Sequence, residues 1–79
     1  MAELLEFLAR QLVDDPDSVR VDEEEDEYGG LVLHLHVAEA DVGKVIGRQG
    51  RIARALRTLV RASAVRDGRR VQVEIADPE

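Results

Sequence analysis

The fold of this chain is decided by the stretch Val45-Ile46-Gly47-Arg48-Gln49-Gly50-Arg51-Ile52, in which two glycines enclose two polar residues between an apolar pair and an arginine-rich segment. Glycine has no Cβ, so at Gly47 and Gly50 the main chain can turn tightly and a sugar-phosphate backbone can approach closely. A turn that opens into a helix also directs free backbone N–H groups and the positive end of the helix dipole toward one spot. The stretch therefore predicts a phosphate-binding loop.

Other glycine-rich loops do not fit this spacing. A dinucleotide-binding loop needs Gly-x-Gly, and a Walker loop needs Lys-Ser or Lys-Thr after its last glycine, and neither is present. Gly43 and Gly47 form a Gly-x-x-x-Gly pair, but the adjacent Lys44 and Arg48 exclude a membrane helix. A simple turn between two helices remains the alternative to a phosphate-binding loop.

The charge is divided between the two halves of the chain. Residues 1–42 carry two basic and thirteen acidic residues, whereas residues 43–79 carry nine basic and four acidic ones, within a total of −6. A polyanion would meet the local positive surface and not the sum. The cations of the segment 43–61, which contains no acid, are Lys44, Arg48, Arg51, Arg54, Arg57 and Arg61.

Length and composition limit the class of protein. The 79 residues predict a single domain, 1–79, close to the size at which only about 60% of the unfolded surface is buried. The absence of cysteine excludes disulfides and thiolate metal sites. No apolar run approaches the ~20 residues of a membrane helix, and the acidic start lacks the basic flank of a signal peptide. We therefore expect a soluble, cytoplasmic protein.

Hydrophobic periodicity predicts a helix and two strands in the first half of the chain. Leucines at helical spacing indicate a helix from Ala2 to about Val13, in which we expect Phe7 to lie in the core. A strand begins near Val19, and the run of six acids over 22–27 predicts a solvated hairpin end. Strict alternation over 31–37 predicts a strand with one face in the core.

The second half is predicted to hold two helices and one strand. Asp41 is placed to cap a short helix that ends near Ile46, and a long helix follows from Arg51 to about Val65. A last strand spans 71–75. Together the elements predict an α+β fold in which a three-stranded sheet packs against helices on one face. The long helix is expected to bury the stripe Ile52, Leu56, Leu59, Val60 and Ser63.

The glycine stretch resembles the signature of the KH domain, an apolar residue followed by Ile-Gly-x-x-Gly-x-x-Ile. In that pattern an isoleucine follows the second glycine by three residues; here Ile52 comes one residue earlier and Ala53 takes that place. The element order α-β-β-α-α-β is similar to the type II, or prokaryotic, KH fold. The runs Asp41-Val42-Gly43-Lys44-Val45-Ile46-Gly47 and Ala55-Leu56-Arg57-Thr58-Leu59-Val60 are similar to those of small stand-alone bacterial KH proteins.

The resemblance implies that the loop clamps the backbone of about four nucleotides of single-stranded RNA, with the bases in an apolar groove beside it. Lys44 and Arg51 would flank the clamp, and Val45 and Ile46 would lie at or beneath the groove. Few side chains that read base edges can be identified, so we expect phosphate-dominated, weakly sequence-selective binding, as suits an RNA chaperone or a post-transcriptional regulator. The implied RNA-binding residues are Lys44, Val45, Ile46, Gly47, Arg48, Gln49, Gly50, Arg51 and Arg54.

A second function stays open. The resemblance also implies self-association, or pairing with a larger protein that carries its own KH domain, with RNA binding secondary. The arginines after the loop, from Arg54 to Arg61, could be an ordinary solvated helix face or could meet a polyanion or an acidic partner. The acids of 22–27 could keep a sheet edge soluble, repel RNA, or meet the arginine face of a second subunit.

Catalytic and metal-binding functions find little support. His34 and His36 share one strand face at a spacing that can bind metal, but cysteine is absent and no third ligand is evident, so a partly exposed sheet face is expected. Ser18, Thr58 and Ser63 have no neighbouring base pattern for nucleophilic catalysis. We expect a protein that is not an enzyme and that uses no metal or cofactor.

Overall fold

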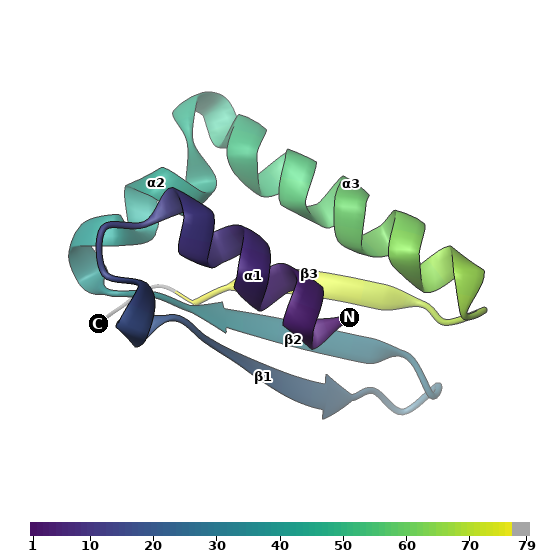
Figure 1. Cartoon of the computed structure of the whole chain (residues 1–79). Coiled ribbons are helices and arrows are strands. Elements are labelled where there is room, and N and C mark those ends of the chain that lie inside the picture. The colour runs from purple at the N-terminus through teal and green to yellow at the C-terminus, as the bar shows by residue number, and fades with distance from the viewer. Residues whose placement is uncertain (77–79) are drawn as a thin grey trace.

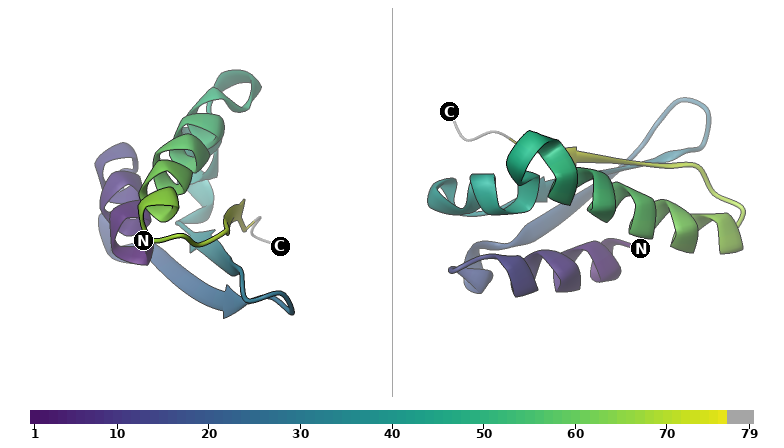
Figure 2. Two further views of the ribbon diagram at one scale, coloured as in Figure 1. Left: turned by 90° about the vertical axis from the view of Figure 1, so that its right-hand side faces the viewer. Right: turned by 90° about the horizontal axis from the view of Figure 1, so that it is seen from above.

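A computed structural model describes residues 1–76 and contains one sheet with the helices gathered on one of its faces (Figures 1 and 2). This arrangement confirms the predicted α+β class and order of elements. Short 3₁₀ turns occupy Pro16–Ser18, Glu39–Asp41 and Arg48–Gly50. The helices are α1 (Ala2–Leu12), α2 (Val42–Ile46) and α3 (Arg51–Arg66), and the strands are β1 (Arg20–Glu25), β2 (Leu31–His36) and β3 (Val71–Ile75).

The sheet has the strand order β1-β2-β3, so β1 and β3 are its edges. β1 pairs antiparallel with β2 through a tight turn, in which the Asp26 carboxylate accepts hydrogen bonds from the N–H groups of Tyr28 and Gly30, both at 2.8 Å. β3 pairs parallel with β2, because the chain crosses the helical face through α2 and α3 between them. The glycine loop therefore lies inside the crossover.

The core lies between the sheet and the helices. Leu31, Leu33 and Leu35 of β2 point toward the helices, as the alternation predicts, and all three are buried. α3 buries residues three or four apart, which places them on one face of the helix. The residues that meet this β2 row include Leu5, Val45, Leu56, Val60, Val71 and Val73.

Two apolar residues predicted to be buried are exposed. Phe7 is 60% exposed, because α1 buries Leu5 and Ala9, and a residue two positions from Leu5 lies on the opposite side of a helix. Leu59 is 51% exposed, because α3 buries the face of Leu56 and Val60 and the neighbouring α1 does not close over Leu59.

Most of the acidic run belongs to a strand and not to a hairpin end. β1 continues to Glu25, whose partner in the register is Leu31, so only the last two acids lie in the turn. Backbone pairing satisfies the main chain of β1 whatever its side chains are, and nearly all of those side chains are exposed. Charged side chains on an edge strand discourage pairing with other sheets, in agreement with the predicted soluble edge.

Candidate nucleic-acid interface

The loop Gly47–Gly50 is an exposed corner between α2 and α3 (Figure 1). Three of its four residues have positive φ: Gly47 at 75°, Gln49 at 57° and Gly50 at 73°. Gly47 also has ψ of 173°, a conformation that is essentially restricted to glycine. The sequence prediction of a tight glycine turn between two helices is confirmed.

Gly47 is additionally required by the first turn of α3. A Cβ on Gly47 would lie 2.7 Å from Cγ1 of Ile52 and 3.0 Å from its Cβ. A Cβ on Gly50 would meet nothing within 4 Å. Ile52 thus packs beneath the loop, while Ala53, which holds the usual isoleucine position of the signature, is buried in the core.

The loop presents backbone donors to solvent. The N–H groups of Arg48 and Gln49 have no hydrogen-bond partner among the described residues, whereas those of Gly47 and Gly50 bond to the carbonyls of Gly43 and Gly47. No side chain caps the start of α3, so the positive end of this sixteen-residue helix opens at the loop. These groups and the charges of Arg48 and Arg51 favour an anion.

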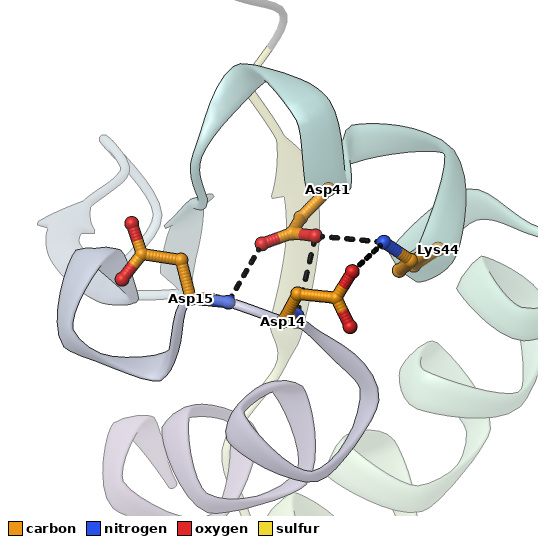
Figure 3. A network of polar contacts seen from close by, with 4 residues as sticks. All are labelled: Asp14, Asp15, Asp41 and Lys44. Atoms are coloured by element: carbon orange, nitrogen blue, oxygen red, sulfur yellow. Dashed lines mark hydrogen bonds and ion pairs between the residues drawn. The ribbon is translucent and has the colours of Figure 1, made fainter.

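A buried carboxylate fixes α2 beneath the loop (Figure 3). Asp41 is 2% exposed, and its carboxylate accepts hydrogen bonds from the N–H groups of Asp14 at 3.2 Å and Asp15 at 3.0 Å. Its side chain makes no hydrogen bond to the start of α2, so the prediction that Asp41 caps that helix is wrong. Asp41 instead joins the end of the α1 segment to the helix that leads into the loop.

Lys44 completes this network. Its ammonium group contacts Asp14 and donates to Asp41 at 3.1 Å. Burial raises the pKa of Asp41, but hydrogen bonds from Lys44 and from the two N–H groups outweigh it, so the pKa is lowered overall. Hydrogen bonds to Asp14 and Asp41 raise the pKa of Lys44. The predicted role of Lys44 at the flank of the clamp stays a prediction, with its charge already held by two carboxylates.

The other predicted RNA-binding residues are distributed over three depths. Arg48, Gln49, Arg51 and Arg54 are exposed on the loop and the first turn of α3. Ile46 is half-buried at the end of α2. Val45 has no exposed surface, so of its two predicted positions it takes the one beneath the groove, where it supports the loop from the core and offers RNA no contact.

The two sides of α3 differ in chemistry. On the side of α1 lies an apolar groove of about 360 Å³, whose only charged residue is Arg51. The opposite side faces β3, where Nε of Arg57 donates a hydrogen bond to the carbonyl of Val73 at 3.2 Å. Sequence reasoning did not distinguish Arg57 from the other arginines of α3. The apolar groove is lined mainly by Leu8, Leu12, Ile52, Ala55, Leu56 and Leu59.

The two histidines lie on the sheet face away from the helices. The ring nitrogens of His34 lie 3.4 Å from Glu24 and 3.5 Å from Glu74, and His36 lies 3.0 Å from Asp22. Within residues 1–76 no three His, Cys, Asp or Glu side chains are arranged to hold a metal ion. In the same range, every helix is too short or too polar to cross a bilayer.

The crossover with its glycine loop, the three-stranded mixed sheet and the preceding helix define a KH domain. The model of the family described as KhpA/KhpB, KH domain, matches residues 2–75, and the chain belongs to this family. The RNA-binding protein KhpA of Clostridium acetobutylicum is 53% identical over 75 residues, which cover 95% of this chain and 99% of that protein. KhpA of Borreliella burgdorferi is 52% identical, covering 95% and 90%, and KhpA of Bacillus subtilis is 44% identical, covering 98% and 94%.

Proposed function

We propose that this chain binds single-stranded RNA by holding its sugar-phosphate backbone at the loop Gly47–Gly50. The observation that carries the proposal is the pair of exposed, unpartnered N–H groups on Arg48 and Gln49 at the amino end of α3. Backbone donors, a helix dipole and two arginines converge there on one anion-binding position. The relatives named above as RNA-binding proteins support the nature of the polyanion.

Binding of this kind depends strongly on salt. Phosphate contacts release counterions, and for a single strand the logarithm of affinity falls with that of salt at about 0.7 per phosphate neutralised. Contacts to about three or four phosphates give a slope of roughly −2 to −3. An affinity that is independent of salt would contradict a phosphate-dominated clamp. Weak sequence selectivity suits a cytoplasmic RNA chaperone or post-transcriptional regulator without catalytic activity.

The loop can be tested without disturbing the fold. The double variant Arg48→Asp, Gln49→Asp reverses the local charge, keeps both glycines and leaves the core intact. We expect RNA binding, measured by fluorescence anisotropy with a labelled decamer, to fall below detection while thermal unfolding stays close to that of the wild type. Arg20→Asp, on the distant strand β1, is the matched control and should bind RNA nearly as the wild type does. Full RNA binding by the loop variant would overturn the proposal.

The apolar groove favours a second candidate function, docking of a protein. The groove between α1 and α3 leaves Leu59 half-exposed beside Leu12, and a surface of this composition suits another apolar surface better than a polyanion. A second copy of this chain or a KhpB-like protein with its own KH domain would be the partner. Leu59→Asp should abolish such association in analytical ultracentrifugation and spare RNA binding by a monomer. Retained association would remove the groove from consideration.

A further inference from the structure

Arg57 differs from the other arginines of α3. It is the half-buried one, whereas the remaining arginines of the helix are exposed. Its Nε–H is bonded to the Val73 carbonyl at 3.2 Å, and no carboxylate within residues 1–76 forms an ion pair with it. Its guanidinium group is therefore held in one orientation, while its two terminal NH₂ groups keep their donors.

The carbonyl that holds Arg57 belongs to the free edge of the sheet. In the parallel pair of β2 and β3, Arg70 accepts a hydrogen bond from Leu31 and Ala76 donates one to Leu35. Alternate residues of a parallel strand direct their backbone groups to the same side, so residues 70, 72, 74 and 76 point toward β2. Val73 therefore points its carbonyl away from the sheet, toward α3.

The position of Arg57 suits contact with a strand of RNA held at the loop. It lies seven residues beyond Gly50, which corresponds to about 10 Å along a helix. It stands on the side of α3 that faces β3, together with Arg61, which lies with Arg70 and Gln72 around a hollow further along this side. This side combines fixed donors with cations, whereas the side facing α1 is apolar.

We infer that Arg57 reads one base of the bound RNA and prefers guanine. The inference rests on the proposed function, which brings the RNA to this side of α3. Guanine presents two acceptors, O6 and N7, on one edge, and these match the paired N–H groups of a guanidinium. An arginine already oriented by the Val73 carbonyl loses less conformational freedom when it makes such a contact.

The test compares decamers of uridine in which one central base is uridine, adenine, cytosine or guanine. We expect wild-type protein to favour the guanine decamer by about tenfold, within the range for a bidentate arginine–guanine contact. Arg57→Lys keeps the charge but lacks the planar fork, and it should reduce this preference to less than about twofold while binding the uridine decamer as before. Arg61→Lys is the matched control and should keep the preference.

A second measurement changes only the RNA. Replacing the guanine with 7-deazaguanine removes the N7 acceptor, so wild-type protein should lose most of its preference, whatever the stability of the Arg57 variant. Equal weakening of all four decamers by Arg57→Lys would assign Arg57 to phosphate binding or to tying α3 to β3, and would overturn the inference. Full RNA binding by the Arg48→Asp, Gln49→Asp variant would instead overturn the proposed function itself.

Discussion

Gly47→Ala tests the reasoning about the loop most directly, because two separate penalties can be read from the structure. The first is conformational: φ of 75° with ψ of 173° costs a residue other than glycine about 1–3 kcal/mol. The second is steric: the new methyl group would lie 2.7 Å from Cγ1 of Ile52 and 3.0 Å from its Cβ. The Cβ atom is attached to the backbone of α3, so this contact cannot be relieved by a side-chain rotation alone, and overpacking costs about 1–3 kcal/mol.

Together these penalties predict that Gly47→Ala lowers the free energy of unfolding by about 3 kcal/mol or more. A chain of this length has a total of roughly 4–12 kcal/mol, so the loss is a large fraction of it. Gly50→Ala is the matched control, because its φ of 73° and ψ of 16° are left-handed helical and its Cβ would meet nothing within 4 Å. It should cost only about 1 kcal/mol.

Urea denaturation followed by circular dichroism measures both variants. The steric part can be isolated with Ile52→Ala, which removes Cγ1 and Cδ1: the double variant with Gly47→Ala should be more stable than the two single losses predict by about 1 kcal/mol or more. Equal losses in Gly47→Ala and Gly50→Ala, or strict additivity in the double variant, would refute the argument that Ile52 packing enforces glycine at position 47.

Three further predictions concern the core, the buried network and the charges. Leu56→Ala should lower the free energy of unfolding by about 3 kcal/mol in urea denaturation, whereas Leu59→Ala should change it by less than about 1 kcal/mol, because only Leu56 is buried. The pKa of Asp41 is lowered from its ordinary 3.8, so its network stabilises the fold above about pH 4 and this contribution is lost as pH falls through the lowered pKa. Asp41→Asn should therefore destabilise the protein at pH 7 and reduce the dependence of its melting temperature on pH between about 2 and 5; an unchanged acid profile would contradict this. Lys44→Met should weaken RNA binding less than about twofold in fluorescence anisotropy, and Arg48→Met severalfold, because the Lys44 ammonium already contacts two carboxylates; equal losses would place Lys44 at the RNA.

The sequence by itself determined the class of fold and the position of the loop, since both depend on local physics. Alternating Leu31, Leu33 and Leu35 could bury only one face of a strand, and glycines were needed wherever φ is positive, as at Gly47 and Gly50. The division of charge between the two halves likewise follows from the order of the residues alone. These features depend on residues that are neighbours along the chain.

Tertiary structure alone decided which partner each remaining side chain meets. Asp41 was expected to cap its own helix, but it binds backbone groups of Asp14 and Asp15, twenty-six or more residues away. Arg57 could not be told from Arg54 until α3 was packed beside the free edge of β3 and the Val73 carbonyl became its acceptor. The physical reason is that helical periodicity fixes the angle between side chains on one helix, while the burial of each side depends on where distant segments pack.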